Sequence, residues 1–271
     1  MMGRGAARGK DGAHRVEDYE PSTYGDRFAD VYDGWYGDVT DVDATVARVA
    51  ALAGAEGGAR GPVLELGAGS GRLAVPLAGA GLDVWAIDAS PAMVEALRAK
   101  PGGDRVHTVV GDMADLDLGP GAPAAFAVVL CAFNTLFNLT DTDAQRRCLS
   151  RVAEVLAPGG RLLVEAFVPP PAGDAGGPSS AVEARHIGLD EVVLSVSRID
   201  PAARTLTGQH VQIREDGIRL RPWVLHYADP DELDALAATA GLRRVERHAG
   251  WHGEPFTSSS DVHVTGYARQ E

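Results

Sequence analysis

The stretch Val63-Leu64-Glu65-Leu66-Gly67-Ala68-Gly69-Ser70-Gly71-Arg72-Leu73 decides the fold. Its first four residues indicate a short buried strand that contains one acid. Glycines then occupy every second position, and the apolar residues that follow have the spacing of an amphipathic helix. A strand, a tight glycine turn and a helix form the first unit of an α/β fold. Such a turn can bind a ligand, because glycine allows close backbone approach and the helix N-terminus offers free N–H groups.

The glycine spacing differs from that of a pyrophosphate-binding turn, which reads G-x-G-x-x-G. Here the third glycine, Gly71, comes one residue early, and Glu65 stands two residues before Gly67. A G-x-G-x-G turn preceded by an acid resembles motif I of class I S-adenosylmethionine (SAM) dependent methyltransferases, in which the turn wraps the amino-acid end of SAM. The alternative is an ordinary strand–turn–helix corner whose small residues serve packing.

Two acids follow the next two expected strands. Asp88 ends the strand expected over 83–88, about 20 residues beyond the turn, where an acid can bind the ribose hydroxyls of an adenosine ligand. Its alternative role is to cap the helix that Ser90-Pro91 opens, although Ser90 can be the cap while Asp88 binds the ligand. Asp112 follows the strand expected over 106–110, where the family has an acid that contacts adenine. Its alternative role is that of a turn residue.

The resemblance extends through the next elements. Residues 126–132 are all apolar, as in a central parallel strand, a helix is expected over 141–156, and a strand over 161–168. The pattern Leu-x-Pro-Gly-Gly-x-Leu-Leu-Val that joins the last two also resembles the family. The resemblance therefore covers residues 63 to 168. It implies an α/β protein with a Rossmann-like, seven-stranded, mostly parallel sheet flanked by helices.

Outside this region the pattern changes. Four consecutive strands are expected over 182–187, 191–199, 204–213 and 218–227, which indicates an added antiparallel β-sheet insertion. A helix over 229–241 and a closing hairpin of strands 242–249 and 262–269 follow. Helices are expected over 24–33 and 42–52. We therefore divide the chain into a disordered tail (1–20), a SAM-binding core with an N-terminal helical lid (21–168), an insertion that covers the acceptor or forms a dimer contact (182–227), and a C-terminal helix with the closing hairpin (228–271).

Composition narrows the partners. The net charge of -13 over 271 residues argues against a nucleic-acid substrate, which needs clustered Lys and Arg. No apolar run is long enough to span a membrane, and no secretory signal is evident. The two cysteines, Cys131 and Cys148, fit a reducing cytoplasm and form neither a disulfide framework nor a metal-ligand pair. We expect a cytoplasmic monomer or homodimer that uses no metal.

The resemblance implies methyl transfer from SAM to a small-molecule acceptor, on nitrogen or oxygen, in specialised metabolism, with S-adenosylhomocysteine as the product. Residues 132–139 resemble glycine and sarcosine N-methyltransferases. Residues 28–33 and the insertion resemble amino-sugar N,N-dimethyltransferases. Alternatives are another SAM- or nucleoside-using enzyme on the same fold, such as a cyclase or aminopropyltransferase, and a non-catalytic SAM-binding protein.

The candidate site residues follow from this resemblance and from their places at strand ends. The expected cofactor-binding residues are Tyr24, Tyr32, Glu65, Gly67, Ala68, Gly69, Gly71, Asp88, Ala89, Met93, Asp112, Met113, Cys131 and Phe133. The expected acceptor-binding residues are Tyr36, Asn134, Phe137, Glu165, Trp223 and Tyr227. The expected catalytic residues are Tyr32, His186 and His226. For each histidine the alternative is a surface or packing role, for Glu165 an ion pair with an arginine, and for the N-terminal aromatics hydrophobic attachment of the lid.

Overall fold

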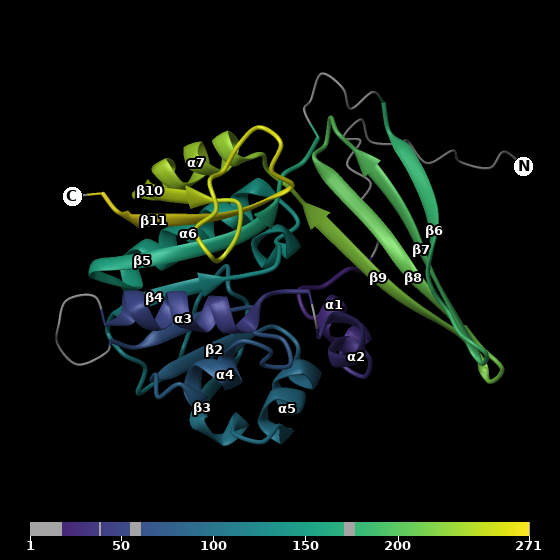
Figure 1. Cartoon of the computed structure of the whole chain (residues 1–271), viewed down its shortest axis with the longest axis horizontal. Coiled ribbons are helices and arrows are strands. Elements are labelled where there is room, and N and C mark those ends of the chain that lie inside the picture. The colour runs from purple at the N-terminus through teal and green to yellow at the C-terminus, as the bar shows by residue number, and fades with distance from the viewer. Residues whose placement is uncertain (1–17, 38, 55–60, 171–176, 271) are drawn as a thin grey trace, which may run out of the picture.

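Two β-sheets stand side by side, and two short N-terminal helices lie near their junction (Figure 1). The computed structural model describes residues 18–37, 39–54, 61–170 and 177–270. Almost all of the predicted tail, 1–20, lies outside the described residues.

Sheet A has seven strands in the order β10-β11-β5-β4-β1-β2-β3. Its parallel strands are β1 (Val63–Leu66), β2 (Val84–Asp88), β3 (Val106–Val110), β4 (Phe126–Cys131) and β5 (Leu156–Phe167). The last strand, β11 (Val262–Arg269), pairs antiparallel with both β5 and β10 (Leu242–His248). The predicted fold class is confirmed. The strand order reverses between β1 and β4, which is where ligands bind in such sheets.

Helices cover both faces of sheet A because successive side chains of a strand point to opposite faces. On β1, Val63 packs with α3 (Val42–Ala53) and α4 (Ala74–Gly79), whereas Leu64 and Leu66 pack on the other face with α6 (Thr142–Val155) and α7 (Pro230–Thr239). The helix α5 (Pro91–Ala99) joins the first group through Leu97. Both faces are therefore apolar, as the sequence of the strands indicates.

Side-chain caps define where four helices begin. Asp41, Ser90, Asp141 and Asp229 each accept hydrogen bonds from the first turn of the helix that follows. At α7 the cap is a reciprocal box with Glu232. These polar residues satisfy N–H groups that have no partner within the helix, so the local sequence alone marks the starts.

Several predicted boundaries differ from the structure, and the first strand of sheet B, expected from residue 182, begins at Ser179. The helix expected over 24–33 is two helices, α1 (Thr23–Phe28) and α2 (Tyr32–Tyr36), and the bend between them lets both Phe28 and Tyr36 be buried. The strand expected over 161–168 starts earlier, at Leu156, because Leu156 already pairs with Phe126 before a register shift. Short 3₁₀ turns occupy Gly103–Arg105 and Thr135–Asn138.

Sheet B is the predicted insertion. Its four antiparallel strands are β6 (Ser179–Ile187), β7 (Glu191–Asp200), β8 (Thr205–Arg214) and β9 (Gly217–His226). One face turns toward α1 and α2, to which Arg221 binds through Asp30. The helices that the structure describes include none that is both long and apolar enough to cross a membrane.

Candidate active site

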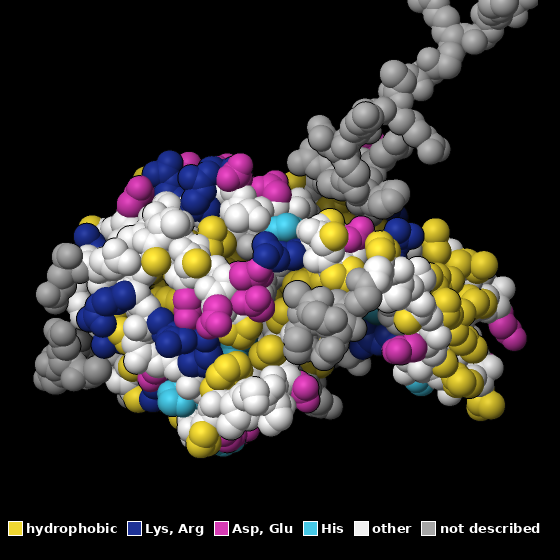
Figure 2. Space-filling model, turned by 90° about the horizontal axis from the view of Figure 1, so that it is seen from above, with side chains coloured by type: hydrophobic (Ala, Val, Ile, Leu, Met, Phe, Trp, Pro, Cys, Tyr) yellow, Lys and Arg dark blue, Asp and Glu magenta, His cyan; other side chains and the backbone are white. Residues whose placement is uncertain are grey.

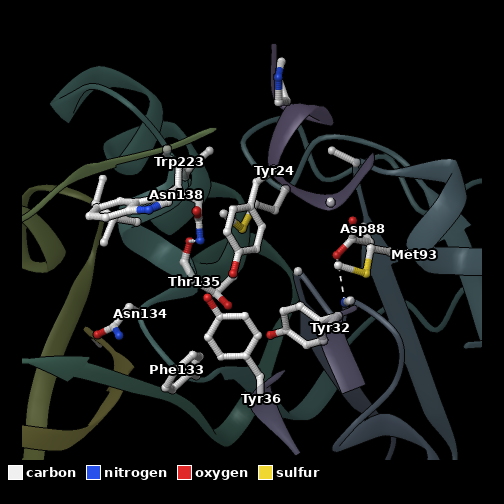
Figure 3. A pocket seen from close by; sticks show the side chains of 18 of the residues that line it. Tyr24, Tyr32, Tyr36, Asp88, Met93, Phe133, Asn134, Thr135, Asn138 and Trp223 are labelled. Atoms are coloured by element: carbon white, nitrogen blue, oxygen red, sulfur yellow. Dashed lines mark hydrogen bonds between the residues drawn. The ribbon is translucent and has the colours of Figure 1, made fainter. Parts of the chain in front are cut away.

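A cavity of about 380 Å³ lies where the glycine turn, the N-terminal helices and sheet B meet. In Figure 3 three tyrosine rings converge in its middle, with Asp88 and Met93 on one side and Trp223, Asn134 and Asn138 on the other. We call the side with Asp88 the cofactor half and the side with Trp223 the acceptor half. Residues far apart in the chain, from the N-terminal helices, the ends of several strands of sheet A and sheet B, line this one space.

The first two glycines of the turn have different tasks. Both lie in the left-handed region, Gly67 at φ +59° and Gly69 at φ +55°. A Cβ atom on Gly67 would lie 2.4 Å from Cγ2 of Thr135, so this glycine packs against the loop after β4. A Cβ on Gly69 would project toward the Tyr32 ring at 3.8 Å. A side chain at Gly69 would therefore enter the cavity.

Asp88 and Ser90 make different contacts at the start of α5. Asp88 accepts the N–H groups of Gly69 at 2.8 Å and Ser90 at 2.9 Å, and it lines the cavity. Burial raises the pKa of the Asp88 carboxyl, and these two hydrogen bonds oppose the rise. Ser90 caps α5 by accepting the Met93 N–H, and it donates to Asp26 at 2.5 Å. The helix cap is therefore Ser90.

Asp112 and Met113 lie at the end of β3 and line the cofactor half. One oxygen of Asp112 accepts the N–H of Ala114 at 2.8 Å, which is the expected turn geometry. The side chain is thus held by its own turn while it faces the cavity.

The tyrosines of the N-terminal helices form the roof between the two halves. The ring of Tyr32 lies 5.0 Å from that of Tyr36, which lies 6.0 Å from that of Phe133. Burial raises the pKa of Tyr32 to about 12, so its hydroxyl is protonated at neutral pH. Phe28 is fully buried behind these rings, so the aromatic cluster also attaches the helices to the core.

The acceptor half contains a polar cluster contributed by sheet B. Nη1 of Arg185 donates to Nε2 of His210 at 2.8 Å and to the hydroxyl of Tyr36 at 3.0 Å. The guanidinium lies 5.1 Å from the centre of the Tyr36 ring. Burial, helped by Arg185 and Arg221, lowers the pKa of His210 to about 4. His210 is therefore neutral at pH 7 and already accepts a hydrogen bond.

Glu65 and Arg72 lie under the glycine turn. Glu65 is buried, and burial raises its pKa to about 8 while the positive charge of Arg72 opposes the rise. Nε and Nη1 of Arg72 are buried and have no hydrogen-bond partner among the described residues. The Arg72 guanidinium lies 5.3 Å from the centre of the Phe133 ring. An arginine with unused donors next to this turn is suited to bind a carboxylate.

Most of the expected cofactor residues line the cavity. They are Tyr24, Tyr32, Gly67, Gly69, Asp88, Ala89, Met93, Asp112, Met113 and Phe133. Four do not: Glu65, Ala68, Gly71 and Cys131. Gly71 instead lets α5 approach, because its Cβ would lie 2.5 Å from Leu97. Cys131 is buried within β4.

The expected acceptor and catalytic residues are only partly brought together. Tyr36, Asn134 and Trp223 line the cavity. Phe137 and Tyr227 are instead buried against Phe167, and Glu165 lies beneath the loop after β4. Of the three expected catalytic residues, Tyr32 lines this cavity. His186 lines a smaller neighbouring cavity, and Nε2 of His226 contacts the hydroxyl of Thr142 at 3.0 Å.

Sequence reasoning missed several lining residues: Thr135, Asn138, Leu139, Phe167, Arg185, Leu206 and Leu225. His210 is favoured by the sequence, together with His186 and His226, because it lies in the expected insertion, but it is not among the expected site residues. For His210 a signal existed, because strict alternation along β8 and β9 places it on one face with Arg221, its direct partner. For Arg185 none existed, since a register shift between Ala184 and His186 changes the alternation of β6.

Comparison with known proteins agrees with this geometry. Residues 63–160 match the family described as a methyltransferase domain. The CcbJ methyltransferase from Streptomyces caelestis is 41% identical, with 93% of this chain and 100% of that chain covered and a TM-score of 0.81. The cypemycin N-terminal methyltransferase of Streptomyces sp is 29% identical over 220 residues, which are 77% of this chain and 83% of that protein. The sugar N-methyltransferase KedS8 from Streptoalloteichus sp ATCC 53650 shares the fold, with a TM-score of 0.63. It is 22% identical, and the match covers 100% of this chain and 99% of that chain.

A seven-stranded sheet of this order, with a glycine turn and acids at the ends of β2 and β3, defines a SAM-dependent methyltransferase fold. The chain belongs to the class I SAM-dependent methyltransferase family. It is an enzyme that methylates small molecules in specialised metabolism, as predicted.

Proposed function

We propose that the enzyme transfers the methyl group of SAM to a nitrogen atom of its acceptor. The observation that carries this proposal is that, among the described residues, the acceptor half offers no histidine or carboxylate that is free to act as a base. His210 is neutral but already bonded to Arg185, and His186 and His226 lie outside the cavity. A hydroxyl acceptor needs a base because its pKa is far from neutral, whereas an amine needs only to be uncharged, desolvated and aligned. Relatives named as N-terminal, sugar and glycopeptide N-methyltransferases support a nitrogen acceptor.

We assign the cofactor half to SAM, which supplies the electrophilic methyl group when bound. Gly67 and Gly69 would lie against its amino-acid end, and the unused donors of Arg72 would bind its carboxylate. Asp88 would accept the ribose hydroxyls, with Asp112 and the backbone of Met113 at the adenine. The faces of Tyr24 and Tyr32 would favour the sulfonium, because aromatic faces attract cations.

The acceptor half indicates the kind of amine. Its polar groups include two donors, the guanidinium of Arg185 and the indole N–H of Trp223, and one acceptor, Oδ1 of Asn138. The Trp223 N–H and the Asn138 Oδ1 are buried and have no partner among the described residues. The described carboxylates of the lining, Asp88 and Asp112, are on the cofactor side. A cation nearby disfavours a protonated amine. We therefore propose an acceptor that enters as a neutral amine and carries carbonyl, carboxylate or hydroxyl oxygens for these donors.

Four finer assignments complete the proposal. Transfer would need no metal, because an aligned neutral amine needs no Lewis acid. The enzyme would work in the cytoplasm, which suits the buried free thiols of Cys131 and Cys148.

Sheet B would cover the acceptor with its inner face. Its outer face would join two copies, because exposed aliphatic side chains gather there (Figure 2). These include Val182, Ile187, Val196, Ile213, Ile218 and Leu220.

The test is a panel of matched acceptors, each offered as the amine and as the corresponding alcohol, with and without EDTA. Mass spectrometry would detect the gain of one methyl group. We expect methylated amines only, at rates that EDTA does not change. A methylated alcohol formed at a comparable rate would refute the nitrogen assignment, and loss of activity in EDTA that added metal restores would refute the metal assignment. Gly69→Val, which fills the cofactor half, is the negative control.

A further inference from the structure

The loop that follows β4 has an unusual backbone. Phe133 and Asn134 both lie in the left-handed region, at φ +47° and +62°. Neither is glycine, so this conformation is unfavourable in isolation and persists only when surrounding contacts enforce it. Both residues line the cavity, Phe133 from the roof side and Asn134 from the acceptor half. The contacts that enforce this conformation therefore shape the site.

One buried acid provides two of those contacts. Oε2 of Glu165, on β5, accepts the N–H of Phe133 at 2.8 Å. The backbone oxygen of Glu165 accepts the N–H of Asn134 at 2.9 Å. Asn134 completes the arrangement, because its Oδ1 accepts the N–H of Phe167 at 2.7 Å. The strained pair is thus bound to β5 at three points.

The second oxygen of the same carboxylate reaches the C-terminal part of the chain. Oε1 of Glu165 accepts the indole N–H of Trp251 at 2.9 Å. Both side chains are buried, with Glu165 8% and Trp251 8% exposed. The carboxylate therefore receives two N–H donors, one per oxygen, in a place that water does not reach freely. Burial raises the pKa of the Glu165 carboxyl, and the hydrogen bonds from Phe133 and Trp251 oppose the rise because they favour the ionised form.

The loop contacts residues in both halves of the cavity. Thr135, the next residue, packs directly on Gly67 of the glycine turn. The Phe133 ring lies under the Arg72 guanidinium and 6.0 Å from the Tyr36 ring. A shift of the loop would therefore move the groups that face the amino-acid end of SAM and the acceptor together.

We infer that Glu165 is a positioning residue for methyl transfer: its carboxylate, clamped by Trp251, holds Phe133 and Asn134 in the left-handed conformation that aligns cofactor and acceptor. Glu165 itself does not line the cavity. Its effect on the reaction passes through the Phe133 amide. This role extends the established methyl transfer and does not depend on which acceptor atom is methylated.

The test is a pair of substitutions, of which the second should restore the SAM binding that the first weakens. Glu165→Gln keeps the shape but has one oxygen for two N–H donors, so its NH₂ group must face either Phe133 or Trp251. Trp251→Phe removes the Trp donor and leaves Phe133 bonded. In the double variant the Gln oxygen can face Phe133 without conflict. We therefore expect Trp251→Phe to restore much of what Glu165→Gln loses.

The readouts are the dissociation constant of SAM by calorimetry, kcat and KM for the acceptor found in the panel, and the NMR resonance of the Phe133 amide. Glu165→Gln should weaken SAM binding about tenfold and lower kcat by about 10- to 100-fold, as small misplacements near a reacting centre do. Thermal unfolding should show that each variant is folded. SAM affinity and the Phe133 amide report on the loop even if no acceptor is found.

Two results would overturn the inference. One is a folded Glu165→Gln variant with wild-type SAM affinity and an unmoved Phe133 resonance. The other is a double variant that binds SAM no better than Glu165→Gln alone, since a merely structural loss would not be repaired by removing a second hydrogen bond. Failure of the nitrogen proposal would appear separately, as methylated alcohols in the panel.

Discussion

At the residue scale, the cofactor half contains a few buried polar groups that lack some of the hydrogen bonds they could make. Asp88 holds the N–H groups of Gly69 and Ser90, and its burial makes the charge costly. A ligand that offers hydroxyl donors would compensate that cost. Arg72 keeps buried donors without a partner among the described residues. Both residues therefore suit the contacts proposed for the ribose hydroxyls and the carboxylate of SAM.

Replacing Asp88 with Ala should weaken SAM binding by about 1.5–3 kcal/mol, because charge-assisted hydrogen bonds to the ribose are lost. Calorimetry with SAM and S-adenosylhomocysteine measures this loss. Asp83→Ala, just before the start of the same strand, is the matched control and should bind normally. Unchanged affinity of Asp88→Ala would restrict Asp88 to a structural role.

Replacing Arg185 with Gln should raise KM for the acceptor by about 10- to 100-fold while SAM affinity stays the same. Arg185 lines the cavity from sheet B, whereas the cofactor half is built by sheet A and α5. Loss of a charged donor to a substrate oxygen is worth about 1.5–3 kcal/mol. Steady-state kinetics with the amine panel measures this change in KM. Arg198→Gln, on the same sheet but outside the cavity lining, serves as the control. Equal losses for SAM and acceptor would contradict the division into two halves.

At the scale of elements, the N-terminal helices are held to sheet B by one buried arginine. Arg221 is 4% exposed, and its Nη atoms donate to both oxygens of Asp30 at 2.6 and 2.9 Å and to Gln212 at 2.8 Å. The guanidinium also lies 5.4 Å from the centre of the Trp35 ring. The pKa of Asp30 is lowered chiefly by its hydrogen bonds with Arg221. The roof over the cavity is thus joined to the sheet that carries the acceptor residues.

Asp30→Ala should loosen this roof, because it leaves a buried cation without its carboxylate. We expect a loss of about 1–3 kcal/mol in the free energy of unfolding and faster cleavage by protease near residues 24–36. Arg219→Ala removes only an exposed partner of Asp30, 3.4 Å away. Such surface pairs contribute about 0–1 kcal/mol. If both variants resist protease equally, Arg221 does not hold the roof.

The strand β11 carries a buried histidine that makes stability depend on pH. His263 is fully buried, and burial lowers its pKa from 6.5 to about 4. Between these values the unfolded chain binds a proton that the folded protein does not, so the free energy of unfolding falls as pH falls from 6.5 to 4. The lowered pKa of His210 also makes the free energy of unfolding fall as the pH falls. His263→Gln should reduce this fall by about 2 kcal/mol down to pH 5, at 1.36 kcal/mol per pH unit below 6.5. Urea unfolding at pH 7.5 and pH 5 measures it, and an identical fall in both proteins would contradict the assignment.

At the scale of the whole molecule, sheet B has two unlike faces. Its inner face carries His210 and Trp223 toward the cavity and Arg221 toward Asp30. Its outer face exposes aliphatic side chains, among them Ile187 at 75% and Ile218 at 65%. A wide exposed apolar face is unusual for a monomer. A second copy would cover it with the same side chains, as a twofold interface requires.

Light scattering should therefore find a dimer, and Leu220→Asp should convert it into a monomer that still binds SAM. The charge would be desolvated in the interface, but Leu220 lies outside the cavity lining. Val262→Asp, a partly exposed apolar residue on β11, should remain dimeric. A monomeric wild-type enzyme would remove the interface proposal and leave the site proposals intact.

The sequence by itself determined the local geometry of this protein. Alternating glycines after an apolar strand dictate a left-handed turn, and the cap residues Ser90 and Asp229 mark helix starts within a few residues. Continuous apolar strands predict a parallel sheet, and consecutive alternating strands predict the second one. Asp88 and Asp112 followed from their positions at strand ends. All of this depends on contacts between near neighbours in the chain.

Only the tertiary structure decided the acceptor half. Tyr36 contacts Arg185 and His210 across 149 and 174 residues of sequence, and a register shift in β6 alters which way its side chains face. The sequence predicts Glu165 as an acceptor-binding acid on a strand. In the structure it lies beneath the loop after β4, where it accepts hydrogen bonds from Phe133 and Trp251. Short-range spacing encodes backbone conformation, whereas which side chains meet between two sheets depends on packing between segments far apart in the chain.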